Sequence, residues 1–502
     1  MAGRTVNGFR TASAFSGVLA CLVVFLSVGC AGSEGSNVEP TQRAEAPARP
    51  NLIFILTDDL DAATARQLPK LHSHLVEEGI SFENSFASFP LCCPSRATVL
   101  SGLYAHNHGV AVNDPPNGGF QKFREGGREE ETIAVRLQEE GYRTALFGKY
   151  LNHYGEDDPT HVPPGWDEWH AKVDPGAEKD TSDGGDEIGG RTEYYDYELN
   201  ENGEVVAYGE GPEDYLTDVL SGGATDFVRR ATSASEPFFL YLAPSAPHDP
   251  ATPAERHEGA FADEKAPRPV SFGEEDVSDK PSWIRERRTI SDRQASRKID
   301  GLYRERLASM LAVDEMVDSL IGELASAGQL DNTFVFFTSD NGWHQGEHRI
   351  RSGKVYPYEE SIRTPLFVRG PGVPGGSRAE KLVLNTDFAP TIADLAGVSL
   401  PGDGRSFAPL LRGEDPAWRV AALLEAAGGG APPTYAGVRT ETHKYIEYQT
   451  GEKELYDLRS DPYETESLHE TAGSSLIQEL KAKLNALSYC AGDGCREVED
   501  SP

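Results

Sequence analysis

The 502-residue chain has few positive charges for its length. Its 47 lysine and arginine residues stand against 81 aspartate and glutamate residues, which gives a formal net charge of −34 at pH 7. Because nucleic acids and acidic membranes are also negatively charged, this balance argues against binding either of them through bulk charge. An anionic substrate would have to be held by a local cluster of cations, against the overall field of the protein.

The sequence also lacks an ordinary membrane-spanning helix at its N-terminus. The apolar run SGVLACLVVFLSVGC, at residues 16–30, follows Arg4 and Arg10 and is too short and wrongly flanked to span a bilayer. Residues 1–30 instead resemble a lipoprotein signal peptide, with small residues before a lipidated Cys30. The alternative is a plain secretory signal cut near the same place. Residues 31–50, rich in Gly, Ser, Pro, Ala and Glu, would form a flexible linker. Both alternatives predict an exported protein, either anchored to the cell surface by lipid or secreted.

Cysteine is scarce, with six residues, of which two belong to the N-terminal segment. Cys490 and Cys495 lie close together in CAGDGC, and in an oxidising compartment such a pair is expected to form a small local disulfide. Cys92 and Cys93 are adjacent, and adjacent cysteines rarely bond to each other because the ring is strained. Spacing alone therefore predicts that both are small buried hydrophobic side chains.

The chain shows no internal repeat, and its hydrophobic pattern alternates between strands and helices. NLIFILT is a continuous apolar run of strand length, which is typical of a strand buried on both faces of a parallel sheet. Further strand-like runs are YRTALFG, FFLYLAP, TFVFFTS and PLFVRG. Helical patterns cover 131–140, 215–231 and 300–327. The alternation predicts an α/β fold with a large, mostly parallel sheet flanked by helices.

Two regions depart from this alternation. Residues 170–213 and 255–298 are polar, charged and rich in Gly and Pro, so we expect them to be surface insertions. From about residue 418 the pattern changes to short antiparallel strands with turns, followed by the helical segment SSLIQELKAKLNAL. We therefore predict a main domain at 51–417 and a small C-terminal α+β subdomain at 418–495.

Polar side chains follow four of the predicted strands. Asp58 and Asp59 come after NLIFILT, Lys149 after YRTALFG, and His248 after FFLYLAP. Asp340 and Asn341 come after TFVFFTS. In an open parallel sheet, ligands bind beyond the carboxyl ends of the strands, so these side chains are expected to share one edge. A solvated loop residue would explain any one of them, but four strand ends together point to a functional site.

The polar residues divide into an oxygen set and a cationic set. Asp58, Asp59, Asp340 and Asn341 offer oxygen ligands, which suit a hard divalent cation, calcium before magnesium. The cationic set would bind a tetrahedral anion, and its members are Arg96, Lys149, His248 and Lys354. In CCPSRATVLSG, Pro94 fits the first turn of a helix, which places Cys92 at a positive helix N-terminus.

The segment CCPSRATVLSG resembles the sulfatase signature Cys-x-Pro-Ser-Arg followed by Leu-x-Gly, with Cys92 in the first place and Cys93 in the variable one. The resemblance to formylglycine-dependent (type I) sulfatases extends over about residues 50–490 and includes TDD, GKY, APH, TSDNG and LYDLRSDPYE. LCCPSRA, HNHGV, FGKYLNHYG and TSDNGWH are most similar to the N-acetylglucosamine-6-sulfatases and extracellular heparan sulfatases. The family implies an alkaline-phosphatase-like α/β fold.

The resemblance also implies a chemistry. Cys92 would be oxidised to formylglycine by a formylglycine-generating enzyme, and would then join the four oxygen-set residues as a metal ligand. The hydrated aldehyde has two hydroxyl groups, of which one attacks sulfur and the other later expels sulfate. Asp340 is the predicted base, and His248 or Lys354 the predicted proton donor. Arg96, Lys149, His248, His344 and Lys354 would bind the substrate, a sulfated carbohydrate that carries 6-O-sulfated N-acetylglucosamine.

One position departs from the family pattern. Many sulfatases have Gly-Lys-x-His at the lysine, and that histidine assists release of sulfate. Here GKYLNHY places Leu151 at the histidine position, with His153 two residues beyond. The glucosamine-6-sulfatase branch shares this substitution, which leaves the residue that regenerates the aldehyde unassigned. His153 could reach inward or could be a surface loop residue.

Three other functions remain open at this point. An arylsulfatase, or a phosphoester or phosphonate hydrolase of the same superfamily, would share the sheet and its metal edge. A catalytically silent protein that binds sulfated glycans is the alternative without enzyme activity, and it requires that Cys92 stay a thiol.

Overall fold

The computed structural model describes residues 49–174, 193–234, 236–429 and 431–501. The predicted signal peptide with Cys30, and nearly all of the predicted linker at 31–50, lie outside these residues. The described residues form one compact unit. Within the described ranges, no helix combines the length and the apolar composition that a bilayer crossing requires.

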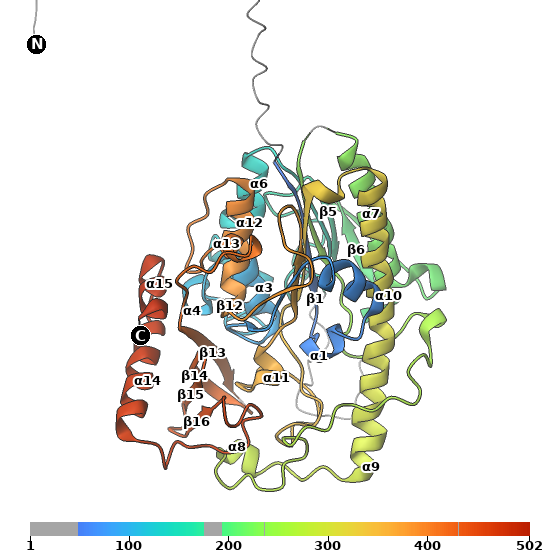
Figure 1. The fold of residues 1–502 in the computed structure, drawn as a ribbon. Coiled ribbons are helices and arrows are strands. Elements are labelled where there is room, and N and C mark those ends of the chain that lie inside the picture. The colour runs from blue at the N-terminus through green and yellow to red at the C-terminus, as the bar shows by residue number, and fades with distance from the viewer. Residues whose placement is uncertain (1–48, 175–192, 235, 430, 502) are drawn as a thin grey trace, which may run out of the picture. The chain divides into compact units, whose positions relative to one another are not determined.

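A ten-stranded mixed sheet runs through the described part of the chain (Figure 1). Its strands are, in spatial order, β11 (Ser377–Ala379), β2 (Ile80–Phe82), β10 (Leu366–Arg369), β9 (Thr333–Ser339), β1 (Asn51–Thr57), β8 (Phe238–Ala243), β4 (Arg143–Gly148), β5 (Glu168–Lys172), β6 (Glu198–Glu201) and β7 (Glu204–Ala207). The central strands β9, β1, β8, β4 and β5 pair in parallel, whereas β10, β6 and β7 pair antiparallel with their neighbours. The predicted large, mostly parallel sheet is confirmed.

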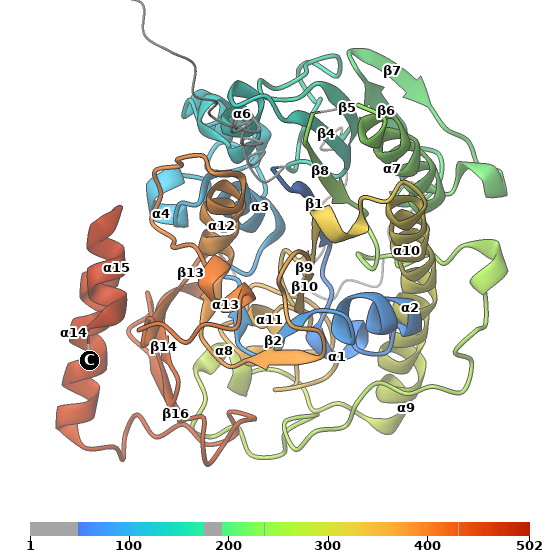
Figure 2. The same ribbon diagram turned by 45° about the horizontal axis from the view of Figure 1, so that its top comes forward.

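Strand β1 is buried along its whole length because helices cover both faces of the sheet. Leu52, Phe54 and Leu56 point to one face, where they join a core with α3 (Cys92–Ser101), α5 (Gly119–Glu125), α6 (Ile133–Glu139), α12 (Phe388–Ala396) and α13 (Ala408–Leu411). Ile53 and Ile55 point to the other face, against α7 (Leu216–Thr232) and α10 (Asp300–Ser326). Figure 2 shows these two layers of helices on opposite sides of the strands. The period of two along a strand therefore explains why NLIFILT is apolar throughout.

The prediction that 170–213 is only a surface insertion is wrong for part of that segment. Residues 198–207 form the β6–β7 hairpin, which extends the sheet beyond β5. Strand β7 is largely exposed, so its polar composition is that of an edge strand. The segment 255–298 carries the short helices α8 (Ser282–Arg285) and α9 (Asp292–Gln294). Trp283 and Ile284 of α8 are buried against the C-terminal part of the chain, where Trp283 contacts Tyr448, whereas α9 is largely exposed and precedes α10.

A second, four-stranded antiparallel sheet lies in the C-terminal part of the chain, as predicted. It consists of β13 (Ala421–Gly429), β14 (Pro433–Thr440), β15 (His443–Tyr448) and β16 (Lys453–Asp457). Helix α14 (Ser474–Leu487) buries Leu480, Leu484 and Leu487 against this sheet, and α15 (Asp493–Asp500) follows it.

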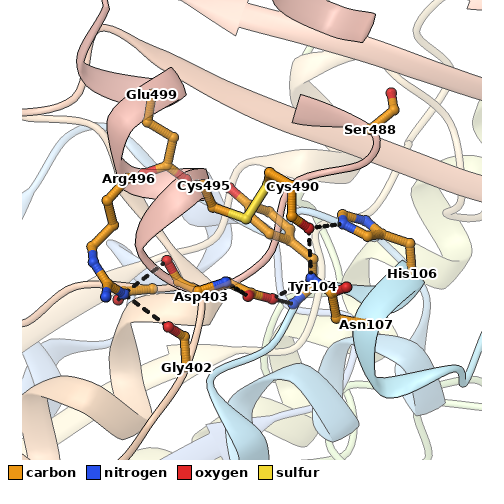
Figure 3. The surroundings of a disulfide bond; sticks show 12 residues. Tyr104, His106, Asn107, Gly402, Asp403, Ser488, Cys490, Cys495, Arg496 and Glu499 are labelled. Carbon is orange, nitrogen blue, oxygen red and sulfur yellow. Dashed lines mark hydrogen bonds between the residues drawn. A yellow bond between two sulfur atoms is a disulfide. The ribbon is translucent and has the colours of Figure 1, made fainter. Parts of the chain in front are cut away.

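The chain end is fastened to the main sheet's helical layer by a disulfide and its neighbours (Figure 3). Cys490 and Cys495 are bonded to each other. The Cys490 carbonyl accepts a hydrogen bond from the Asn107 amide at 2.9 Å and lies 3.0 Å from a ring nitrogen of His106. Both residues belong to the short helix α4 (Ala105–His108), so the disulfide loop holds the C-terminus against the segment that follows α3.

Arg419 is the buried centre of a further link between the two sheets. Its guanidinium binds both carboxylate oxygens of Asp387 at 2.5 and 2.6 Å, and its Nε lies 3.0 Å from Glu499. The Tyr104 hydroxyl donates to the same Glu499 carboxylate. All four side chains are buried, so the ion pairs and hydrogen bonds among them must compensate for the hydration that the charged groups have lost.

We expect Arg419→Met to destabilise the protein by about 3–5 kcal/mol, because it leaves the buried Asp387 without its cation and removes one of the two arginines that pair with Glu499. Arg412→Met is the matched control, since Arg412 pairs with Glu414 on the exposed surface, where a pair contributes at most about 1 kcal/mol. Urea unfolding followed by far-ultraviolet circular dichroism measures both. Equal losses in the two variants would contradict the role assigned to Arg419.

Candidate functional site

Four adjacent strands deliver polar side chains to one edge of the large sheet. In the order β9, β1, β8 and β4 they run parallel, with Ser339 beside Thr57 and Gly148 beside Ala243. The residues that follow these strands therefore leave the sheet at the same edge. The structure brings together the residues that the sequence placed at these strand ends, namely Asp58, Asp59, Lys149, His248, Asp340 and Asn341.

The oxygen set is compact and buried. One carboxylate oxygen each from Asp58, Asp59 and Asp340, together with the Cys92 sulfur, lie within 4.8 Å of one another. Asn341 Nδ2 donates to Asp59 Oδ1 at 2.7 Å, and the Asp59 amide donates to Asp340 Oδ1 at 3.1 Å. Asn341 Oδ1 is buried and has no hydrogen-bond donor among the described residues. Three clustered carboxylates and an amide oxygen without a partner fit a hard divalent cation.

Three cationic side chains surround this oxygen set. Lys149 forms an ion pair with Asp58, and Arg96 Nε donates to Asp340 Oδ2 at 2.8 Å. Lys354 Nζ lies 2.8 Å from the Asp59 carboxylate and 2.9 Å from the Cys92 sulfur. The cations and carboxylates thus alternate around Cys92, which allows so many charges to be buried together.

Burial and neighbouring charges set the protonation of the site. Burial favours the neutral form of Asp58, but Lys149, His248 and Arg96 outweigh it and hold the pKa of Asp58 well below its usual range. Burial, with the charge of Asp58, raises the pKa of Asp340 to about 6. The pKa values of the two carboxyl groups therefore differ widely, and Asp340 is the one that can exchange a proton near neutral pH.

The two adjacent cysteines lie in different environments. Helix α3 begins at Cys92, after Leu91 in an extended conformation, and Pro94 lies in its first turn as predicted. The Cys92 sulfur lies 3.2 Å from Asp58 Oδ1, whereas Cys93 packs in the apolar core on the α3 face of the sheet. Burial raises the pKa of both thiols, that of Cys93 to about 12, so neither is a thiolate nucleophile at neutral pH.

The histidines at or near the predicted site differ in their placement. His248 is partly exposed, and its Nε2 lies 3.8 Å from Asp59 Oδ2, at the edge of the cluster. His344 is fully buried: its Nδ1 lies 3.2 Å from the Ser361 hydroxyl, its ring packs edge-on against Tyr356, and its amide donates to the carbonyl of Gly353, which precedes Lys354. The contact between His344 and substrate stays a prediction.

The Leu151 segment supplies no catalytic histidine to this cluster. Leu151 is buried in the core, and both ring nitrogens of His153 face carboxylates, Asp114 at 2.9 Å and Glu156 at 3.0 Å. His153 is thus a loop residue held by acids rather than a residue that reaches inward.

The sequence interpretation missed Arg306. This residue lies in α10, is buried, and donates to the backbone carbonyls of Asp59 and Pro247. The sequence contained a signal for this residue. Arg306 lies on the apolar stripe of the helix, one turn before Met310 and next to Leu307, where a hydrophobic side chain would be expected. A buried arginine without a charged partner on its own helix points to an acceptor elsewhere in the fold.

Comparison with known proteins assigns the chain to a family. A family profile described as Sulfatase matches residues 50–398, and one described as N-sulphoglucosamine sulphohydrolase, C-terminal, matches 346–489. The chain is 34% identical to N-acetylglucosamine-6-sulfatase of Capra hircus over 93% of this chain and 87% of that protein. It is also 34% identical to the Homo sapiens protein of the same name, over 95% of this chain and 90% of that one.

The fold comparison agrees with these sequence matches. A solved structure of BT4656 in complex with its substrate D-glucosamine-2-N,6-O-disulfate has a TM-score of 0.73 and 27% identity, and the match covers 90% of this chain and 99% of that one. The phosphonate monoester hydrolase of Agrobacterium radiobacter has the same fold, with a TM-score of 0.65 at 22% identity. With the Cys-x-Pro-Ser-Arg segment at the centre of the charged cluster, these matches show that the chain belongs to the sulfatase family and is a sulfuric ester hydrolase of alkaline-phosphatase-like fold.

Proposed function

We propose that this sulfatase removes the 6-O-sulfate from glucosamine or N-acetylglucosamine residues of glycosaminoglycan-like glycans, with a formylglycine derived from Cys92 as the nucleophile and calcium as the metal. The observation that carries the mechanism is the position of Cys92. It is the residue at which the oxygen set and the cationic set meet, and it opens a buried helix. The named substrates of BT4656 and of the curated relatives support the choice of sugar.

The side chains around Cys92 divide the work of sulfate ester hydrolysis. Arg96, Lys149 and Lys354 would bind the sulfate oxygens, since their charges converge on the place where the sulfate must lie. His248 sits at the partly exposed edge and would donate a proton to the leaving sugar oxygen. Asp340 would accept the proton of the attacking hydroxyl, since its carboxylate lies within 4.8 Å of the Cys92 sulfur. In the net reaction water cleaves the S–O bond, giving the sugar alcohol and sulfate.

The metal and the modified cysteine would supply a Lewis acid and a nucleophile, which the unmodified chain lacks. Asp58, Asp59, Asp340 and Asn341 would hold calcium, with magnesium as the alternative, and the ion would draw charge from the sulfate group. A formylglycine at position 92, as its hydrate, would supply one hydroxyl group for attack on sulfur with departure of the sugar oxygen, and a second whose deprotonation would release sulfate and restore the aldehyde. The unmodified Cys92 thiol is buried and neutral, so by itself it is a poor nucleophile. Conversion to formylglycine would replace it with a reactive group.

The remaining parts of the proposal concern the cell. We infer export from the signal-like residues 1–30 and from relatives named extracellular sulfatases, such as the Drosophila melanogaster SULF-1 homolog. Export is consistent with the Cys490–Cys495 disulfide. Lipidation of Cys30 would then anchor the enzyme, a formylglycine-generating enzyme would mature it, and the catalytic part would span 51–417 with a subdomain at 418–495.

A phosphonate or phosphate ester hydrolase is the second candidate. The phosphonate monoester hydrolase of similar fold favours it, because the same charged edge can hold a tetrahedral phosphoryl group. A phosphonate monoester carries one negative charge, as a sulfate ester does, whereas a phosphate monoester can carry two. Relative turnover of all three esters with the same leaving group therefore separates these functions.

Cys92→Ala is expected to lower sulfatase activity by at least about 10⁴-fold without unfolding the protein, because it removes the nucleophile. Cys93→Ala is the matched control and should keep activity within about threefold, since that thiol only fills core space. The protein is made together with a formylglycine-generating enzyme, and mass spectrometry of the peptide should show an aldehyde at position 92. An active enzyme with both thiols intact would overturn the mechanism.

Removal of calcium by a chelator should abolish turnover, and added calcium should restore it. Asp340→Asn should lower both calcium affinity and kcat by at least about 100-fold, because it removes a ligand charge and the proton acceptor. Asp314→Asn is the control, since Asp314 is a buried carboxylate that binds the backbone of Lys70 and Leu71 on the far face of the sheet. Calorimetric titration and initial rates give the two readouts. Full activity after exhaustive chelation would refute the metal assignment.

We expect kcat/KM for N-acetylglucosamine 6-sulfate to exceed that for a simple aryl sulfate or an aryl phosphate by at least about tenfold. Only a sugar substrate can use contacts beyond the sulfate group, and those contacts raise its transition-state binding. Sulfate release from a panel of sulfated monosaccharides, polymers and aryl esters measures the ratio. An aryl sulfate that is turned over faster than every sulfated sugar would contradict the proposed substrate.

A further inference from the structure

Arg306 connects three of the loops that build the active site. It lies in the second turn of α10, more than 200 residues from Asp59 in sequence, and only about 1% of it is exposed. One guanidinium nitrogen donates to the Asp59 carbonyl, and another donates to the Pro247 carbonyl at 3.0 Å. The guanidinium also stacks over the Trp343 ring, with its carbon 4.9 Å from the ring centroid. The three contacts reach the loops after β1, β8 and β9.

Each of these loops carries a residue assigned to the reaction. Asp59 is itself a proposed calcium ligand, Pro247 directly precedes His248, and Trp343 follows Asn341 by two residues. The planar, rigid fork of an arginine suits this task, because its donors hold two carbonyl groups at fixed relative positions. A lysine has a single point of charge and cannot bridge the carbonyls in the same way.

The placement of this charge is also informative. A buried guanidinium that donates to neutral carbonyls costs free energy unless nearby negative charge compensates for it. Here the nearest carboxylate is Asp61, whose Oδ2 lies 3.6 Å from Arg306, and the buried carboxylate of Asp59 belongs to the same loop. The side chain therefore places a buried positive charge against the loop that carries Asp59 and Asp61.

We propose that Arg306 is a positioning residue of the sulfatase, which fixes the calcium ligand Asp59 and the proton donor His248 relative to each other. This inference rests on the proposed function for the roles of Asp59 and His248. Arg306 touches the backbone of their loops, so it acts through these residues and not on the substrate. Because a displacement of about 1 Å at reacting groups can cost roughly 100-fold in rate, its loss should appear in kcat more than in KM.

The test compares wild type, Arg306→Met, Arg306→Lys and the control Arg304→Met. Arg304 lies on the same helix but donates to the Glu264 carbonyl at the surface. The substrate is an aryl sulfate, because its hydrolysis can be measured whichever sulfated sugar the enzyme prefers. With it we expect Arg306→Met to lower kcat by about 100-fold and to change KM less than about threefold. Its calcium affinity should fall by about tenfold, Arg306→Lys should recover part of both losses, and Arg304→Met should match wild type.

A second variant keeps the test decisive if Arg306→Met unfolds. Arg306→Ala leaves space for a free guanidinium ion, and guanidinium at low concentration should restore part of kcat in this variant but not in Cys92→Ala. Folded Arg306→Met with wild-type kcat and calcium affinity, or an Arg306→Ala enzyme that guanidinium does not rescue, would overturn the inference. Failure of the proposed function has a different signature, since an enzyme without preference for 6-sulfated glucosamine, or one active without calcium, would still show the loss of kcat in the Arg306 variants.

Discussion

The structure depends on the burial of three carboxylates and three cations at one edge of a parallel sheet. Asp58, Asp59 and Asp340 would repel one another strongly in a medium of low dielectric. Lys149, Arg96 and Lys354 each pair with one of them, and the pairs are distributed around Cys92. Neither set could be buried without the other, so the site is stable only when both are assembled.

The sheet holds this cluster because both of its faces are closed by helices. The apolar strands β1, β8 and β9 cannot shift by a residue without moving core side chains of one face into the other. Their carboxyl ends are therefore fixed relative to one another, and so are the acids that follow them. The same packing buries helix α3 entirely, so Cys92 is held at the junction of the two charged sets while Cys93 occupies the core.

The C-terminal sheet is tied to this scaffold by polar links as well as by apolar contacts. Arg419 bridges Asp387 and Glu499, and the disulfide loop binds the segment after α3. The residues that follow the helix of Cys92 are thus held by hydrogen bonds to segments that lie some 300 to 400 residues later in the sequence. A site made of groups with opposite charge needs such a rigid surround, because small displacements change the electrostatic energy at short distances.

The sequence by itself determined the alternation of strands and helices, the acids and cations at the strand ends, and the special place of Cys92 before Pro94 and Arg96. These are local properties, since hydrophobic period, helix start and motif spacing are all written within a few residues. Only the tertiary structure decided which charges become neighbours, because Lys149 and Asp58 are 91 residues apart and Lys354 and Asp59 are 295 apart. It also decided that Arg306 binds the carbonyl groups of two loops of the site, and that residues 198–207 extend the sheet. Each of these depends on strand order and helix packing, which no short stretch of sequence specifies.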